Sequence, residues 1–312
     1  MQGNQNLQVR LLAKTLTTVV PFLLLAAPLW AQGAGARRPP GFLEIWLLPR
    51  VWVGAIFCLI GLVLLMRSSV TRNLRLAMLV VIFFVFGIVS ILPLGQFARG
   101  MSVHPSPICT MTRPFQFMNA GRAVPVVFIS IAVSVALLTI VGNKLFCGWA
   151  CPIGAIQEAF HRIPVSKRLK VKLPFWITNS IRVILFVVFL VVVFSLGTSI
   201  YDYFNPFHFF HWSFELLPVA ALLVALVAGV FIFRPFCYLV CPLGLFTWVL
   251  EHLSLVRVKV KKDACTECNV CIKKSPCPAV PAILEGRRSR PDCHACGRCI
   301  EVCPEDALHF RV

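Results

Sequence analysis

Long apolar stretches constrain this chain more than any other feature of its sequence. A helix that crosses a bilayer needs about 20 mostly apolar residues, and the candidates are residues 11–31, 51–66, 76–95, 124–146, 177–197 and 215–236. Hydrophobic residues make up 58% of the 312 residues and charged residues only 13%, against about 25% charged in an ordinary soluble domain. These proportions exclude a purely soluble enzyme, a disordered chain and a small disulfide-stapled domain. We therefore expect a multi-span α-helical membrane protein.

The first 36 residues are open to two interpretations. Arg10 and Lys14 precede an apolar run, and the small residues Ala34, Gly35 and Ala36 follow it. This order is typical of a cleaved secretory signal peptide, and it equally fits a first transmembrane helix. In both cases we expect residues 37–256 to form a transmembrane domain with about five spans.

The positive charges predict the orientation of these spans. The net charge is +18, and Lys and Arg gather in segments 67–75, 161–173 and 257–262. Because cytoplasmic loops carry an excess of Lys and Arg, we place these segments in the cytoplasm beside anionic lipid and expect no nucleic-acid partner. The loop 198–214, which has no Lys or Arg, is then outside. The loop 96–123 carries three arginines, but the alternation of spans places it outside as well.

Two segments of the membrane part share a motif. Both Cys147–Pro152 and Cys237–Pro242 read Cys-x3-Cys-Pro, at an offset of 90 residues, and a Pro-Phe-x-Phe sequence precedes each of them, from Pro114 and from Pro206. Each unit then consists of an outer Pro-Phe-x-Phe loop, an inward-running span and a cysteine pair at the cytoplasmic mouth. Equal orientation of the two units predicts an internal parallel repeat.

The four cysteines of these motifs have two interpretations. Residues four apart on a helix share one face, and the proline of each motif is expected where a helix breaks or restarts. The thiols would then converge on a third metal centre or cluster, or form a redox-active set. The alternative is a pair of membrane-surface turns whose cysteines pack against Trp149 and Tyr238. Two copies at matched positions favour a function for Cys147, Cys151, Cys237 and Cys241.

The tail, residues 257–312, carries the most specific motif. The run Cys293-x2-Cys-x2-Cys-x3-Cys303-Pro has the spacing of a bacterial ferredoxin, and an earlier run begins at Cys265 and ends with Cys277-Pro after a gap of five residues. In two-cluster ferredoxins the fourth cysteine of each run ligates the other cluster. We therefore predict a small α+β ferredoxin-like domain with two [4Fe–4S] clusters, held by Cys265, Cys268, Cys271 and Cys303 and by Cys293, Cys296, Cys299 and Cys277. Structural zinc suits this spacing poorly, and a reducing cytoplasm disfavours disulfides.

The remaining candidates are weaker. His208 and His211 lie in an aromatic segment at the outer interface, where they are candidates for a site near a quinone or a haem, although an aromatic belt explains the same residues and is the favoured interpretation. Cys58 is expected to be a small core residue. His294 and His309 are expected on the surface of the tail. No Cys-x2-Cys-His motif for covalent haem is present, and no phosphate-binding loop or nucleophile elbow supports hydrolase or kinase chemistry.

This combination of motifs resembles the NapH and MauN group of membrane polyferredoxins, and the membrane part of NosR is similar. The resemblance covers about residues 100–312 and rests on the two Cys-x3-Cys-Pro motifs, Asn205-Pro206 and the two cluster runs. It implies a multi-pass protein of the bacterial inner membrane with the ferredoxin domain in the cytoplasm. It also implies that electrons pass between membrane quinol and a redox partner that serves a periplasmic reductase or dehydrogenase.

Three functions are compatible with these features. The first is an iron–sulfur electron-transfer subunit, such as that of a quinol dehydrogenase, that connects the quinone pool or a cytoplasmic donor to cytochrome- or ferredoxin-type partners. The second is a maturation protein that supplies electrons to a metal site or cofactor of a periplasmic enzyme. The third is a redox sensor, which ranks last because no output domain is recognisable. The basic tail suits an acidic donor or the lipid surface.

Overall fold

A computed structural model describes residues 41–311, apart from 90–91, 93–94, 102–105, 212–214, 289 and 291. The predicted signal peptide or first transmembrane helix, residues 1–36, lies outside the described residues.

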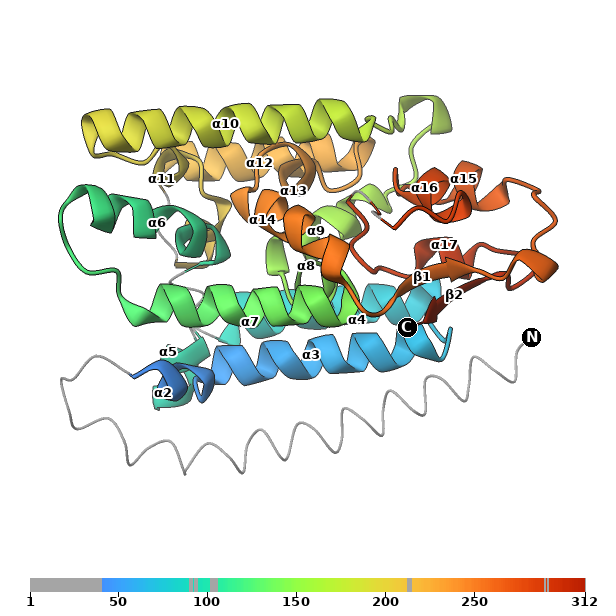
Figure 1. Ribbon diagram of the computed structural model, residues 1–312, viewed down its shortest axis with the longest axis horizontal. Helices are drawn as coiled ribbons and strands as arrows, with labels where there is room; N and C mark the ends of the chain where they lie inside the picture. The colour runs from blue at the N-terminus through green and yellow to red at the C-terminus, as the bar shows by residue number, and fades with distance from the viewer. Residues whose placement is uncertain are drawn as a thin grey trace.

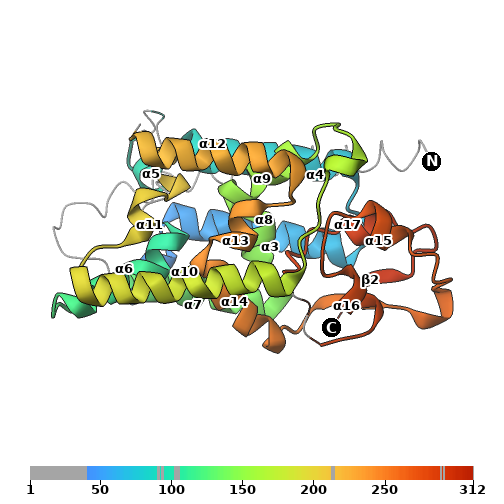
Figure 2. The same ribbon diagram turned by 90° about the horizontal axis from the view of Figure 1, so that it is seen from above.

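The body of the described structure contains five helices of 16 to 22 residues that run side by side (Figures 1 and 2). They are α3 (Pro49–Met66), α4 (Arg72–Gly87), α7 (Val126–Gly142), α10 (Phe175–Leu196) and α12 (Leu216–Phe231). Successive helices of this set run in opposite directions. The segments that follow α3, α7 and α12 therefore lie at the end next to the tail, and those that follow α4 and α10 lie at the far end (Figure 1).

Local signals in the sequence fix the ends of these helices. The Thr71 hydroxyl accepts a hydrogen bond from the backbone N–H of Leu74 and caps α4. Gly197 ends α10 in the left-handed conformation that glycine adopts at little cost. Asn143, with φ of 53°, ends α7 four residues before Cys147, the first cysteine of the motif. Each predicted span from residue 51 onward coincides with a helix, although most of these helices are shorter than the predicted spans, and the predicted span 11–31 lies outside the described residues.

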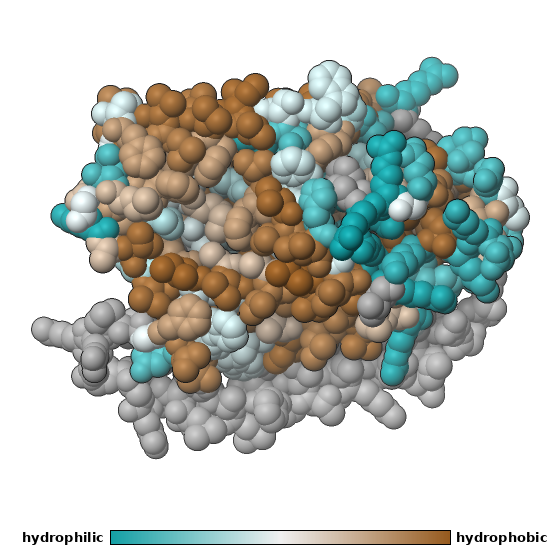
Figure 3. Space-filling model, in the orientation of Figure 1, coloured by the Kyte–Doolittle hydropathy of each residue, from teal (hydrophilic) through white to brown (hydrophobic). Residues whose placement is uncertain are grey.

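Two of the five helices meet the length and composition expected of a membrane span. These are α3 and α10, whereas α7 and α12 are equally apolar but shorter. All five helices carry large apolar side chains on the surface, including Ile184, Val191 and Val224 with 61%, 62% and 68% exposed. On the face that Figure 3 shows, hydrophobic side chains cover the helices and hydrophilic side chains gather over the tail.

Each Cys-x3-Cys-Pro motif breaks the chain into two short helices. The first pair is α8 (Leu145–Trp149) and α9 (Pro152–His161), and the second is α13 (Pro235–Leu239) and α14 (Pro242–Leu250). The second cysteine of each motif is the extended N-cap of the following helix, with ψ of 116° at Cys151 and 117° at Cys241. The prediction that each pair shares one face of a continuous helix is therefore wrong. The residue before a proline avoids the helical conformation, so the proline restarts the helix as expected.

The far end of the molecule is helical where the sequence predicted loops. It contains α2 (Phe42–Trp46), α5 (Gly95–Met101), α6 (Pro107–Asn119), α11 (Ile200–Tyr203) and the 3-10 helix η3 (Pro206–His211). Pro114, the start of the first Pro-Phe-x-Phe sequence, lies inside α6. The Ser106 hydroxyl, which accepts a hydrogen bond from the N–H of Cys109, starts this helix together with Pro107. The prediction of an outer loop at this position is therefore wrong.

The tail forms a small α+β unit. Strand β1 (Arg257–Val260) pairs antiparallel with β2 (Leu308–Arg311), so the start and the end of the tail lie together. Between them in sequence lie the 3-10 helix η5 (Lys262–Ala264) and the helices α15 (Val270–Lys274), α16 (Val280–Leu284) and α17 (Arg298–Glu301). Two further 3-10 helices, η2 (Lys167–Leu169) and η4 (Glu251–Leu253), precede the tail. One hydrophobic core joins Leu65 and Trp149 of the body to Ile300 and Phe310 of the tail. The tail is therefore packed against the helices.

Candidate iron–sulfur sites

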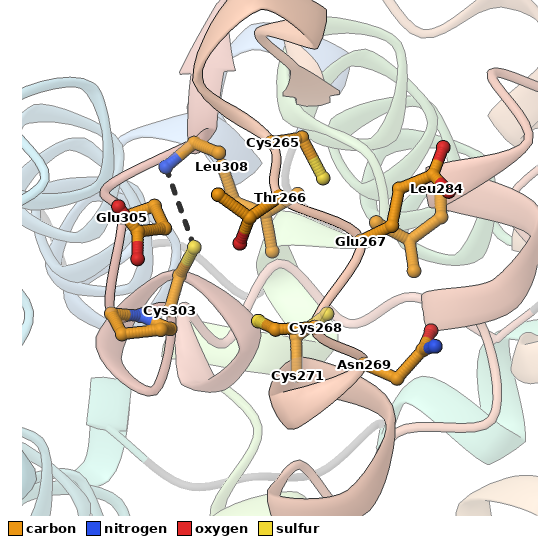
Figure 4. Close-up of a pocket in the computed structure, with 12 residues that line it drawn as sticks. Cys265, Thr266, Glu267, Cys268, Asn269, Cys271, Leu284, Cys303, Glu305 and Leu308 are labelled. Atoms are coloured by element: carbon orange, nitrogen blue, oxygen red, sulfur yellow. Dashed lines mark hydrogen bonds between the residues drawn. The ribbon is translucent and has the colours of Figure 1, made fainter.

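The cysteines predicted for the first cluster line one pocket in the tail. Figure 4 shows this pocket, which is lined by Cys265, Cys268, Cys271 and Cys303. Cys268 is exposed to solvent. The backbone N–H of Ala307 donates a hydrogen bond of 3.3 Å to the sulfur of Cys303. Burial raises the pKa of Cys271, and the thiols of Cys303 and Cys268 add to this shift. We call these four residues the outer cysteine set.

The cysteines predicted for the second cluster also lie together, but they are buried. The thiol of Cys277 interacts electrostatically with those of its three predicted partners, and all four residues are 4–6% exposed. Burial raises the pKa of Cys293 to about 12. Because the thiolate is the metal-binding form, cluster assembly here must displace the proton. The residues of this inner cysteine set are Cys277, Cys293, Cys296 and Cys299.

The two ferredoxin runs share an unusual backbone conformation. Glu267 and Asn269 have φ of 52° and 56°, and the matching residues of the second run, Ala295 and Gly297, have φ of 47° and 77°. Non-glycine residues in this region cost about 1–3 kcal/mol each and persist where the surroundings impose them. Left-handed residues alternating with others turn backbone N–H groups into anion-binding hollows that are found at iron–sulfur sites. Both the thiols and the backbone therefore fit a cluster at each set.

The four cysteines of the Cys-x3-Cys-Pro motifs also lie near one another. The thiol of Cys147 interacts electrostatically with all three others, and Cys147 and Cys241 belong to one hydrophobic cluster with Val135 and Leu243. We call this set, Cys147, Cys151, Cys237 and Cys241, the membrane cysteine set. Among the residues that the structure describes, no three His, Cys, Asp or Glu side chains converge as a single metal ion would require. The same is true of the two tail sets. A cluster does not require such convergence on one point, because its thiolates bind several different iron atoms.

The inner cysteine set lies directly against the first Cys-x3-Cys-Pro turn. The indole N–H of Trp149 donates a hydrogen bond of 2.8 Å to the carbonyl of Ala295. Gly148 lies so close to the carbonyl of His294 that a side chain at position 148 would overlap with it. The ring centroids of His294 and Tyr238 are 5.2 Å apart. The residues between two predicted cluster ligands, His294 and Ala295, therefore contact both motif turns.

His294 is buried rather than on the surface as predicted. It is 3% exposed, and burial lowers its pKa well below the ordinary value, which keeps the imidazole neutral. The prediction was wrong because the sequence does not show that the body covers this loop of the tail. His309 is only partly buried, and its Nδ1 lies 3.4 Å from the Ser68 hydroxyl.

Asp292 links the tail to the body through buried ion pairs. Its Oδ1 lies 3.0 Å from Nζ of Lys144 and 2.9 Å from Nη1 of Arg182. The Tyr238 hydroxyl donates a hydrogen bond of 3.3 Å to its carbonyl. Sequence reasoning missed this residue and its partners. The signal was available, because charged residues within apolar stretches, such as Arg182, are rare and usually functional.

The histidines predicted for a quinone or haem site lie at the far end of the helices. His208 lines a cavity with Tyr203, Glu215 and Leu216, at the end of α10 and the start of α12. His211 belongs to the same 3-10 helix, but its side chain lies outside the described part. The structure therefore places His208 beside a cavity and brings it to neither cysteine set of the tail.

Comparison with known sequences defines the class of protein. A family described as "4Fe-4S binding domain" matches residues 124–172 and 214–262, and each match contains one Cys-x3-Cys-Pro motif. A second family of the same description matches residues 291–309, which contain the second ferredoxin run. The chain is thus a ferredoxin-type iron–sulfur protein of electron transfer. No solved structure matches it.

The relatives narrow this class further. The ferredoxin-type protein NapH of Escherichia coli strain K12 is 26% identical over 69% of this chain and 78% of its own length. The methylamine utilization ferredoxin-type protein MauN of Methylobacillus flagellatus is 27% identical over 45% of this chain and 51% of its own. The regulatory protein NosR of Stutzerimonas stutzeri is 27% identical over 56% of this chain and 25% of its own. The resemblance to polyferredoxins of the NapH/MauN type seen in the sequence is confirmed.

Proposed function

We propose that this protein is an electron-transfer subunit of a membrane redox complex. It passes electrons between the quinone pool, or a cytoplasmic donor, and a partner that serves a periplasmic oxidoreductase. The observation that carries this proposal is the contact between the inner cysteine set and the body, where the Trp149 indole is hydrogen-bonded to the carbonyl of Ala295. This contact brings predicted cluster ligands of the tail next to the cysteines at the mouth of the helices.

The tail is proposed to hold two [4Fe–4S] clusters, one at the outer set and one at the inner set. When bound, such clusters supply one-electron oxidation and reduction over a wide range of potentials. The chain itself supplies the thiols, the left-handed loops at Glu267 and Ala295 and the hydrogen bond from Ala307 to Cys303. Because Cys268 is exposed while the inner set is buried, the outer set is the natural place for exchange with a soluble partner.

The membrane part is proposed to be multi-pass, with the tail in the cytoplasm. The apolar side chains exposed on all five long helices support this proposal, because large exposed apolar surfaces mark contact with lipid or partners. The helices alternate in direction, and the loops at the tail end carry the basic residues of segments 67–75 and 161–173. This distribution agrees with the excess of Lys and Arg in cytoplasmic loops.

The membrane cysteine set is proposed to hold a third iron–sulfur centre within an internal parallel repeat. Both motifs have the same local structure, with a short helix, an extended cysteine and a restarted helix. Both also match a family described as "4Fe-4S binding domain". The four thiols lie close enough to interact with one another, which fits a shared centre better than two independent turns.

Anaerobic EPR on the purified full-length protein tests this function. We expect iron and acid-labile sulfide in excess of what the two tail clusters hold, and cluster signals on reduction with dithionite. Cys299→Ala should lose the signal of the inner set, whereas Cys58→Ala, which changes a buried lone cysteine of α3, should lose none. Cluster signals that appear with reduced quinol support the quinone link. Signals that appear with dithionite alone would exclude quinol as the donor, and equal spectra of the two variants would refute the assignment of the inner set.

A further inference from the structure

An arginine from elsewhere in the chain closes each Cys-x3-Cys-Pro turn. Nη1 of Arg234 donates a hydrogen bond of 2.5 Å to the carbonyl of Cys147 in the first turn. Nη1 of Arg182 donates one of 3.5 Å to the carbonyl of Cys237 in the second turn. The contacted carbonyl belongs to the first cysteine of the motif in both cases. The same interaction is therefore built twice, although the two arginines stand at different places in the sequence.

A glycine in each motif makes room for the guanidinium group. Gly154 and Gly244 both stand two residues after the motif proline. A Cβ atom at either position would lie 2.9 Å from Nη1 of the arginine and 2.9 Å from the carbonyl that this arginine contacts. Such a distance is too short for a carbon atom, so a larger residue would displace the arginine. The repeated glycine is thus explained by the repeated arginine.

Buried carboxylates hold both arginines, and each carboxylate has a second cation. Glu158 pairs with Arg234 at 2.5 Å and with Arg75 at 2.9 Å. Asp292 pairs with Arg182 and with Lys144 in the same way, and Lys144 also lies 3.5 Å from Glu251. Four fully buried cations therefore face three buried carboxylates at this mouth.

Two of these cations interact with the membrane cysteine set. The thiols of Cys151 and Cys237 interact electrostatically with Arg234, and those of Cys237 and Cys241 interact with Arg182. Nε of both arginines is buried without a hydrogen-bond partner among the described residues. Uncompensated buried charge and unpaired buried donors are costly. An anionic centre at the four sulfurs would compensate this charge.

We propose that Arg182 and Arg234 are positioning residues that hold the two turns around one anionic electron-transfer centre and raise its reduction potential. This rests on the third centre proposed above. Four thiolates carry more negative charge than an iron–sulfide core carries positive charge, and reduction adds a further electron. A fixed positive charge in a buried, low-dielectric site stabilises the more negative, reduced state more than the oxidised state. The potential therefore shifts upward.

Redox titration of the full-length protein, followed by EPR, tests this role. Arg182→Gln and Arg234→Gln remove one charge each, and both should lower the midpoint potential of the third centre, with a larger shift in the double variant. Asp292 and Glu158 keep a second cation in these variants, so neither is left unpaired. Arg162→Gln is the matched control, because it also pairs with Glu158; it should leave the potential unchanged. Arg182→Lys and Arg234→Lys keep the charge and should restore the potential.

The possible outcomes separate this proposal from the proposed function. A third signal whose potential is the same in the Gln variants and in Arg162→Gln would overturn the role of the arginines and leave the third centre intact. A wild-type protein that shows only the two tail clusters would overturn both. The cluster of the outer set serves as an internal reference, because in the described part of the chain neither arginine interacts with its cysteines; a potential shift that affects it equally reflects general disruption and also counts against the proposal.

Discussion

The two cysteine sets of the tail have nearly the same spacing in sequence and opposite surroundings in the structure. The outer set lines a pocket at the surface, and Cys268 is exposed. The inner set is at most 6% exposed and lies under the body, next to Trp149 and Tyr238. The left-handed residues Glu267 and Ala295 occupy matching positions in the two loops. The same local backbone conformation therefore occurs in two different environments.

The difference between the sets indicates which of them a soluble partner can reach and which of them faces the body. A surface set is accessible to a docking partner, whereas the inner set is accessible only through the body. The connection between them is built into the fold, because the tail is held by buried ion pairs and by a shared hydrophobic core. The predictions below test how far the buried environment of the inner set depends on particular contacts of the body.

The largest effect is expected from Asp292→Asn. This change leaves Lys144 and Arg182 with less compensation in a buried site, and breaking a buried pair costs about 3–5 kcal/mol. Thermal unfolding of the full-length protein should show a large loss of stability. In the control Glu285→Gln, the lost partner is Arg287 in an exposed pair, which is worth about 0–1 kcal/mol. Equal unfolding temperatures for the two variants would show that the ion pairs do not hold the tail.

A smaller effect is expected from Gly148→Ala. The added methyl group would overlap with the carbonyl of His294 in the loop of the inner set, and overpacking of this kind costs about 1–3 kcal/mol. We expect the tail to be released faster in limited proteolysis, with the outer set unaffected in its EPR signal. Gly54→Ala is the control, since its nearest neighbours would lie 3.8 Å away. Equal cleavage rates in both variants would contradict a tight contact at position 148.

The smallest effect is expected from His161, which supports the mouth of the body. Its ring packs against Phe233, which forms one hydrophobic cluster with Tyr238 and Cys296, and burial lowers the pKa of His161 to about 4. The unfolded chain binds a proton near pH 6.5 while the folded protein does not. Stability should therefore fall as the pH drops from about 6.5 to about 4. In His161→Gln this part of the pH dependence should disappear, as measured by unfolding at several pH values; an unchanged profile would refute it.

Much of the local structure was predictable because it follows from short-range rules. The apolar stretches located the five long helices, and Pro152 and Pro242 marked the points where helices restart. The ferredoxin spacing located both cysteine sets, including Cys277 despite its longer gap. These features depend on residues close together in sequence. The one-face argument for Cys147 and Cys151 failed for a related reason, since the proline overrides the helical period before the second cysteine.

The sequence by itself determined the class of this protein, through the apolar stretches and the cysteine runs. Only the tertiary structure decided that the inner set is buried, that His294 is neutral and covered, and that Arg182 and Arg234 close the two turns. These properties arise between residues 55 to 148 positions apart, such as Lys144 with Asp292 and Arg182 with Cys237. A motif specifies which atoms bind a cluster, while burial and nearby charge, which set its potential, come from the packing of distant segments.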